Sequence, residues 1–145
     1  MYRELLEQLT KNYKYAKLQK PCSDTDIARA EEYVGFTFPE ELKALLKDTN
    51  GDHYFLLSAE EIINNTKCNR EIFPEFLTQN EFEEKVNRFI FFATNGCGDY
   101  YCYRILETGE TDISAIYIWE HELFEIRKVA TDISDLICRY YNNEI

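Results

Sequence analysis

Hydrophobic positions in the first third of the chain recur at the spacing of amphipathic helices. They predict three helices, over residues 2–18, 23–34 and 39–50. Ser23, followed three residues later by Asp26, resembles a capping box at the start of the second helix, and Gly35 is placed to end it. Pro39 suits the first turn of the third helix. The first helix fills most of an amphipathic N-terminal segment, residues 1–20.

From residue 53 onward, short runs rich in β-branched and aromatic residues are typical of strands. Strands are predicted over residues 53–57, 89–94, 100–106, 115–119 and 123–127. Ser58 has the position of an N-cap for a brief helix. Residues 64–80 lack a clear period, so we expect a long loop or irregular helix there, with a helical turn at 81–86. Thr131 or Asp132 caps a last helix that carries Ile133, Leu136, Ile137, Tyr140 and Tyr141.

Helices and strands are segregated along the chain instead of alternating strictly. This order predicts an α+β fold, with a mostly antiparallel sheet flanked by helices, because strict alternation would indicate a parallel sheet. The length of 145 residues fits one domain, 1–145, that is large enough to bury a core. The sequence shows no repeat and no low-complexity segment.

Two of the predicted strands are joined by a glycine-flanked turn, residues 95–99, with the sequence Asn-Gly-Cys-Gly-Asp. The two glycines indicate backbone with positive φ, or backbone with no room for a Cβ. A phosphate-binding loop would need a third glycine and a following helix, and Asp99 would repel phosphate. Cys97 would need a base to act as a nucleophile, and the sequence places neither His53 nor His121 beside it. We therefore interpret the turn as structural.

The other polar residues form no catalytic or metal-binding pattern. Adjacent glutamates on helices point about 100° apart and make no acid–base dyad. In Glu120-His121-Glu122, strand alternation places the glutamates opposite the histidine, and the spacing of metal ligands is absent. Trp119, the only tryptophan, is interpreted as a core or sheet-edge anchor, with an interface anchor beside an acidic rim as the alternative. We expect no catalytic residue, no metal and no cofactor.

The charge of the chain is strongly acidic and unevenly distributed. Sixteen basic and twenty-seven acidic residues give a net charge of −11. Residues 1–20 carry five basic and two acidic groups, a charge of +3, so the remainder carries −14. Such a field disfavours direct binding of nucleic acid and favours a basic partner, although net charge that serves only solubility is an equal alternative.

The five cysteines, at positions 22, 68, 97, 102 and 138, are odd in number and form no Cys-x-x-Cys pair. The sequence has neither the pattern of a signal peptide nor an apolar run of the ~20 residues that a membrane span needs. Free thiols in a reducing cytoplasm are the simplest interpretation, with no membrane partner.

In their order and spacing, these features resemble the SUKH superfamily, named for yeast cell-wall regulators and related viral and bacterial domains. The resemblance rests on a helix–turn–Pro–acidic–helix segment, a helix-ending Asn-Gly and a strand–turn–strand with a Gly-x-Gly-Asp centre, at residues 27–42, 45–51 and 91–103. With the closing strands and the terminal helix it covers residues 22–140. Phe38-Pro39 stands where many members have Leu-Pro, and residues 64–88 match no part of the pattern.

The resemblance implies an α+β domain without a known catalytic constellation. Bacterial members commonly are immunity proteins that bind and neutralise polymorphic toxins, many of them nucleases. A nuclease binds a polyanion and tends to be basic, so an acidic inhibitor gains association rate from electrostatic steering. The resulting hypothesis is a cytoplasmic immunity protein whose partner is a basic cognate toxin domain, with a nuclease as the favoured class.

The residues expected to contact this partner lie at loop and strand ends. They are Asp52, His53, Asp99, Tyr100, Glu120 and His121. The alternative function is a non-catalytic regulatory adaptor that binds a cellular protein, and an enzyme is not expected. No oligomeric state is predicted.

Overall fold

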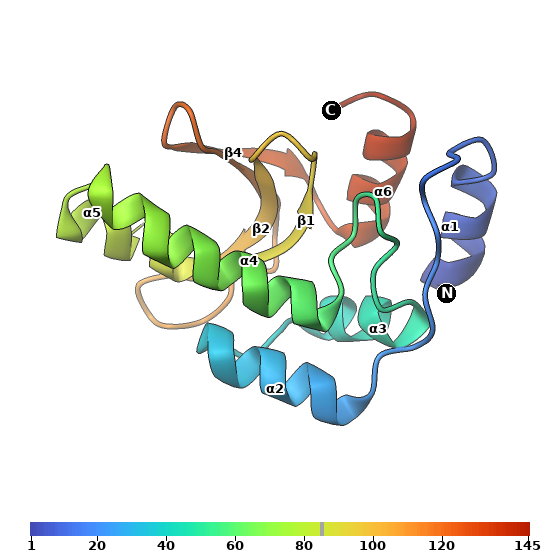
Figure 1. The fold of residues 1–145 in the computed structure, drawn as a ribbon, viewed down its shortest axis with the longest axis horizontal. Coiled ribbons are helices and arrows are strands. Elements are labelled where there is room, and N and C mark those ends of the chain that lie inside the picture. Colours follow the sequence, from blue (N-terminus) through green and yellow to red (C-terminus); the bar gives the residue numbers. More distant parts are fainter. Residues whose placement is uncertain (85) are drawn as a thin grey trace.

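Four antiparallel strands form one sheet in the order β1-β2-β3-β4, so strands that are consecutive in the sequence are neighbours in space (Figure 1). The strands are β1 (Phe89–Thr94), β2 (Tyr100–Arg104), β3 (Ile116–Glu120) and β4 (Glu125–Ala130). The computed structural model describes residues 1–84 and 86–145. The observed fold is the predicted one, a single α+β domain with an antiparallel sheet flanked by helices.

Side chains alternate between the two faces of this sheet, because successive residues of a strand point to opposite sides. Ile90 and Phe92 lie on one face, and Phe89 and Phe91 lie on the other. The register of β1 against β2 shifts between Phe91 and Ala93, which marks a bulge next to the glycine turn. The sheet therefore separates two hydrophobic clusters.

The first three helices are α1 (Tyr2–Leu9), α2 (Asp24–Val34) and α3 (Glu40–Asp48). The predicted ends of α2 are confirmed: the Ser23 side chain accepts a hydrogen bond from the Asp26 N–H at 3.1 Å, and Gly35 follows with a φ of 92°. The predicted helix over residues 2–18 is wrong beyond Leu9. The last helical hydrogen bond runs from the Thr10 N–H to the Leu6 carbonyl at 2.8 Å, and the chain then turns, with the Tyr13 N–H donating to the Thr10 carbonyl at 2.9 Å.

Residues 53–57 do not form the strand that their apolar and aromatic run predicts. Within the described residues this segment contributes only a single bridge, between Leu56 and Ala93. The Asp52 carboxylate accepts hydrogen bonds from the backbone N–H groups of Tyr54, Phe55 and Leu56, at 3.0, 2.7 and 2.8 Å. These bonds bend the chain back on itself, and His53 has a positive φ of 59°.

Helix α4 (Ala59–Ile72) is longer than the brief helix expected from Ser58, and it extends into the segment that lacks a clear period. Its start is a complete capping box between Ser58 and Glu61. The chain continues through the 3-10 turn η1 (Phe73–Glu75), α5 (Gln79–Glu84) and the 3-10 turn η2 (Val86–Arg88). Of the helical turn predicted at 81–86, residue 85 lies outside the described residues.

The last helix, α6 (Ile133–Tyr141), begins at Asp132, whose side chain accepts a hydrogen bond from the Asp135 N–H at 2.8 Å. Tyr141 ties this helix to distant segments. Its hydroxyl donates to Asp52 at 2.6 Å, and its carbonyl accepts from the Tyr13 hydroxyl at 2.6 Å. Burial is the main cause that raises the pKa of Tyr141, so the hydroxyl keeps its proton and remains a donor.

The two faces of the sheet have different coverings. The closed face packs against α1, α2, α3, the start of α4 and α6, and it contains the larger cluster. The pocket face packs against η1, Leu77 and η2, in a smaller cluster of Phe73, Leu77, Val86, Phe89, Phe91, Cys102 and Trp119. In Figure 1, α4 runs across the front of the sheet from the helical side toward α5. Its C-terminal half borders the pocket face.

Candidate protein-binding site

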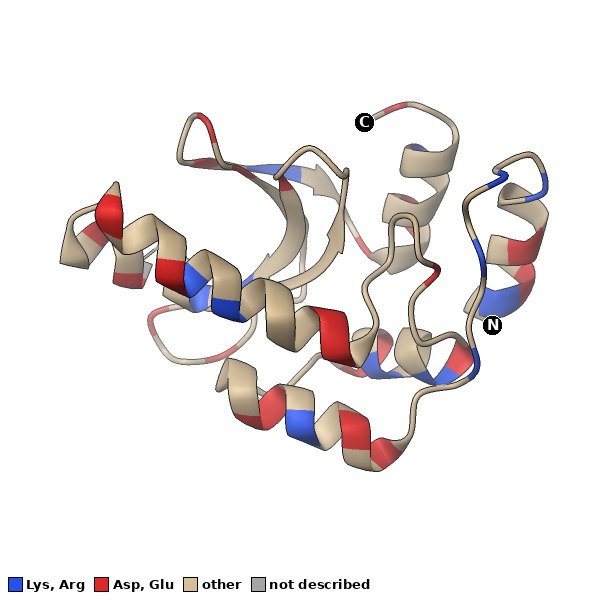
Figure 2. Ribbon diagram, in the orientation of Figure 1, with Lys and Arg blue, Asp and Glu red and all other residues tan. Residues whose placement is uncertain are grey.

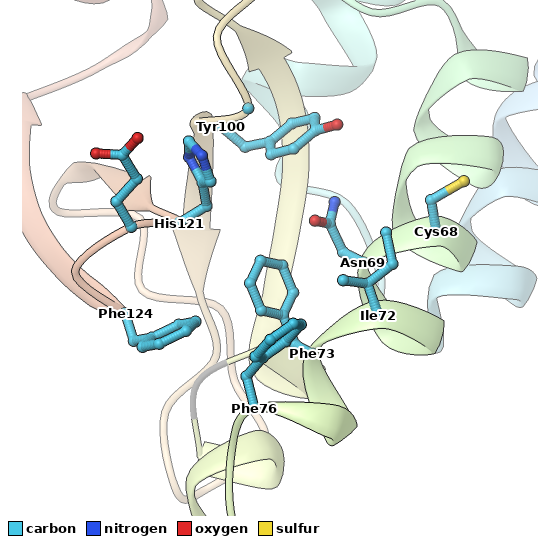
Figure 3. A pocket seen from close by; sticks show the side chains of 10 residues that line it. Cys68, Asn69, Ile72, Phe73, Phe76, Tyr100, His121 and Phe124 are labelled. Atoms are coloured by element: carbon cyan, nitrogen blue, oxygen red, sulfur yellow. The ribbon is translucent and has the colours of Figure 1, made fainter.

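A pocket of about 500 Å³ opens between the C-terminal half of α4 and the turn that joins β3 to β4. Its lining residues are Cys68, Asn69, Ile72, Phe73, Phe76, Gly98, Tyr100, His121, Glu122 and Phe124. Figure 3 shows the α4 side chains along one wall and His121 and Phe124 on the opposite wall. Volumes of this size are typical of ligand pockets, which are mostly apolar with a few polar groups.

Hydrogen bonds that involve Asn65, Asn69 and Arg70 of α4 hold the helical wall in place. The Asn69 amide donates to the Asn65 carbonyl at 2.8 Å, and the Asn65 side chain accepts from the Tyr100 hydroxyl at 2.6 Å. The Arg70 guanidinium donates to the Val34 carbonyl at 2.6 Å, which ties α4 to the end of α2. The wall is therefore anchored to both the sheet and the helical layer.

The opposite wall is organised by Asp99 of the glycine turn. One of its carboxylate oxygens lies 2.6 Å from His121 Nδ1 and accepts the His121 backbone N–H at 3.1 Å. The other oxygen accepts from the Asn95 amide at 3.2 Å. Burial raises the pKa of Asp99, but the hydrogen bonds from His121 and Asn95 outweigh it, and the net pKa is below the usual range. Asp99 thus remains charged and holds His121 in place.

Gly98 allows the His121 ring to lie against the turn. It has a φ of 96°, and a Cβ at this position would lie 2.8 Å from the His121 ring. Gly96 also has a positive φ, of 79°, but its Cβ would point into open space. The positive φ expected at both glycines is confirmed, and only Gly98 also needs to lack a side chain.

Aromatic rings form the floor of the pocket and continue into the core. The Phe73 ring lies 5.5 Å from the Trp119 ring and 5.9 Å from the Phe124 ring, centroid to centroid. Trp119 is fully buried, as expected for a core anchor, and its burial excludes direct contact with a partner in this conformation. Its indole N–H has no hydrogen-bond partner in the part of the chain that the structure describes. Ring packing alone therefore positions it.

The mouth of the pocket exposes large apolar side chains. Ile72 is 52% exposed and Phe76 is 64% exposed, at the end of α4 and just beyond it. Leu123, beside the lining residue Glu122, is exposed as well. Adjoining apolar side chains with a polar border are typical of interaction sites.

The segments on either side of the pocket are acidic. Residues 71–84 contain five glutamates, residues 120–125 contain three, and neither segment contains lysine or arginine. Figure 2 shows acidic positions at α5 and at the tip of the β3–β4 hairpin. In contrast, the N-terminal segment carries most of its charge as lysine and arginine (Figure 2).

The structure brings four of the six expected contact residues together. Asp99, Glu120 and His121 line one shallow hollow, and Tyr100 and His121 line the pocket. Glu120 is half-buried and forms an ion pair with Arg127 at 2.8 Å. Because His121 belongs to both cavities, these residues form one continuous border.

The other two expected residues lie elsewhere. His53 is exposed in the loop that precedes Leu56 and is not among the residues that line the pocket. Asp52 is fully buried, and its carboxylate is occupied by three backbone N–H groups and the Tyr141 hydroxyl. Direct contact between Asp52 and a partner is therefore excluded in this fold, and the residue shapes a loop.

The α4 wall was missed by the sequence analysis because it falls in the segment without a clear period. A signal was present in the neighbouring apolar residues Ile72, Phe73 and Phe76, each close to a glutamate. Their assembly with Tyr100 and Phe124 depends on the fold, since the two walls lie far apart in the sequence.

Within the described residues, Asp99 is hydrogen-bonded to His121, but no hydrogen bond joins the Cys97 thiol to the His121 ring. Cys97 is an exposed free thiol that lines the same shallow hollow as Asp99 and His121. Among the described residues, no group of three or more His, Cys, Asp or Glu side chains is arranged to hold a metal ion. The glycine turn leads into β2, so it does not meet a helix N-terminus as a phosphate loop would. The arrangement is suited to holding an apolar group beside a cation.

Fold and site together define an α+β domain with a preformed apolar pocket and an acidic border. The chain matches the SMI1 / KNR4 family (SUKH-1) over residues 21–139, and it belongs to this family. The resemblance noted over residues 22–140 is thereby confirmed. A comparison with curated protein sequences found no match. Among the described residues, no helix has both the length and the apolar character needed to cross a membrane.

Proposed function

We propose that this protein is a cytoplasmic immunity protein that binds and neutralises the domain of a polymorphic toxin, with a nuclease as the favoured class. The observation that carries the proposal is the charge of the family domain. The chain has a net charge of −11 although residues 1–20 carry +3, so the rest of the chain carries −14. A body with this charge attracts a basic protein and repels its nucleic-acid substrate.

Inhibition follows from binding alone in this proposal. A nuclease must present a basic cleft to its polyanionic substrate, and an acidic protein placed over that cleft or beside it blocks access. Electrostatic steering speeds the encounter of the two proteins, while contacts in the interface set the dissociation rate. The protein needs no catalytic residue or cofactor for this role.

The test uses the C-terminal domain of a large secreted protein encoded next to this gene, co-expressed with the chain in a bacterial host. We expect the chain to restore growth and to co-purify with the domain as a stable complex. The association rate should fall at least tenfold between about 50 and 500 mM salt, because exposed charges are screened.

Continued growth arrest in the presence of the folded chain would overturn the proposal for that pair. Stable binding to a housekeeping or signalling protein instead, without rescue from any neighbouring toxin domain, would assign the chain to the adaptor class. Circular dichroism of the purified chain provides the folding control.

A further inference from the structure

We infer that the pocket between α4 and the β3–β4 turn is the anchor site for the toxin domain, and that it receives an apolar side chain flanked by lysine or arginine. This inference rests on the proposed function and specifies its binding site. Interfaces of this kind concentrate their binding energy in a few bulky side chains that fill pockets on the partner.

The shape of the pocket fits a side chain better than a flat surface would. It has a volume of about 500 Å³, with buried Phe73 at its floor, Phe124 on the wall opposite α4, and the exposed side chains of Ile72 and Phe76 at its mouth (Figure 3). The exposed parts of Ile72 and Phe76 would be removed from water by an apolar side chain from a partner. A leucine or phenylalanine side chain has the size and the chemistry for this space.

The border of the pocket selects for positive charge. Glu122 lines the pocket, and Glu71 and Glu75 are the sequence neighbours of the mouth residues Ile72 and Phe76. All three glutamates are exposed, and none of them forms an ion pair within the described part of the chain. Their charges are therefore free to meet lysine or arginine of a partner. A second copy of this chain, with its net charge of −11, would be repelled at this border, so a basic partner is the matching occupant.

The walls are held in position before any partner arrives. Asp99 fixes the His121 ring, and the Tyr100 hydroxyl binds the Asn65 side chain of α4 at 2.6 Å. Preorganised walls reduce the entropy lost on binding. A natural reporter lies beneath the pocket, because the single tryptophan, Trp119, packs against the floor residue Phe73.

The first experiment measures the affinity of the toxin domain for three variants of the chain. Ile72→Glu and Phe76→Glu place a charge in the pocket mouth at positions that are already exposed, so the fold should be retained. Ile113→Glu is the matched control, since Ile113 is 69% exposed and does not line the pocket. We expect the dissociation constant to rise at least tenfold for the two pocket variants and less than twofold for the control.

If the toxin domain binds and all three variants behave alike, the pocket inference is overturned while the proposed function stands. If the toxin domain does not bind the unmodified chain, the proposed function fails for that pair. If the toxin domain does not bind, a peptide titration still tests which side chains the pocket accepts.

The second experiment titrates the chain with capped pentapeptides and follows Trp119 emission. The probe is Lys-Gly-Leu-Gly-Lys, and the controls are Lys-Gly-Ala-Gly-Lys and Glu-Gly-Leu-Gly-Glu. We expect a saturable change with the probe alone, with a dissociation constant on the order of millimolar, and its loss in Phe76→Glu. An equal response to all three peptides, or no response to any of them, would contradict the inference whatever the toxin domain does.

Discussion

The closed face and the pocket face of the sheet both carry apolar and aromatic side chains, but they differ in how completely the chain covers them. On the closed face, helices from both ends of the chain cover the sheet, and side chains such as Ile90 and Leu136 are fully buried. On the pocket face, η1 and η2 cover only part of the sheet, and aromatic side chains continue from buried Trp119 to exposed Phe76. One face is closed by the chain itself, while the other leaves apolar surface in contact with water.

This difference assigns stability and binding to opposite sides of one sheet. A buried side chain contributes to folding through the area removed from water, whereas an exposed one at a pocket mouth contributes mainly when a partner arrives. Substitutions on the two faces should therefore separate loss of stability from loss of binding.

The largest effect is expected for Leu136→Ala on the closed face. Leu136 is fully buried, so truncation removes buried area and leaves a cavity that costs about 2–5 kcal/mol in the free energy of unfolding. Phe76→Ala on the pocket face should cost less than about 1 kcal/mol, because Phe76 is 64% exposed. Chemical denaturation of both variants measures the difference.

Equal losses of stability in these two variants would contradict the division between the faces. The same Phe76→Ala variant is also assayed for affinity to the toxin domain. Its near-normal free energy of unfolding would exclude misfolding as the cause of weaker binding.

An intermediate effect is expected for Gly98→Ala, with Gly96→Ala as its control. Both residues have a positive φ, which costs a non-glycine residue roughly 1–2 kcal/mol. Only Gly98→Ala also brings a Cβ to 2.8 Å from the His121 ring, so this variant should lose about 1 kcal/mol more. Thermal unfolding gives the two stabilities, and Trp119 emission shows whether the pocket wall has moved. Equal stabilities of the two variants would mean that the His121 ring moves aside without a loss of stability.

The smallest effect concerns pH. The pKa of Asp99 in the folded protein is lowered, so its charged form stabilises the fold above the unfolded pKa of about 3.9, and this contribution is lost as pH falls through the folded pKa. Asp99→Asn should therefore be less stable than the unmodified protein by about 1 kcal/mol at pH 7. The difference should shrink as the pH falls below about 4, where Asp99 becomes protonated. A gap that widens below about pH 4 would contradict the role given to Asp99.

The boundaries that the sequence predicted well are set by local chemistry. Ser23, Ser58 and Asp132 begin helices because their side chains accept backbone N–H groups only three residues away. Gly96 and Gly98 mark a turn because their backbone has a positive φ. Such signals depend on a few neighbouring residues and can be interpreted without the fold.

The features that the sequence did not predict depend on distant contacts. The length of α4 was hidden because its buried positions include Thr66 and Asn69, which break the apolar period. The loop after Asp52 has the apolar and aromatic run of a strand, yet the buried Asp52 carboxylate, which is hydrogen-bonded to Tyr141, directs its backbone. The expected contact residues Glu120 and His121 lie at the border of the site, but its apolar pocket requires two segments that meet only in the folded protein.

The hydrogen bond from the Tyr13 hydroxyl to the Tyr141 carbonyl has a consequence for the order of folding. It joins residues 128 positions apart, and α1 packs beside α6, so the closed face is completed only after residue 141 has been synthesised. Until then the surfaces of α1 and β4 that meet α6 remain uncovered in the nascent chain. Contacts of such long range slow folding and leave apolar surface open to chaperones during translation.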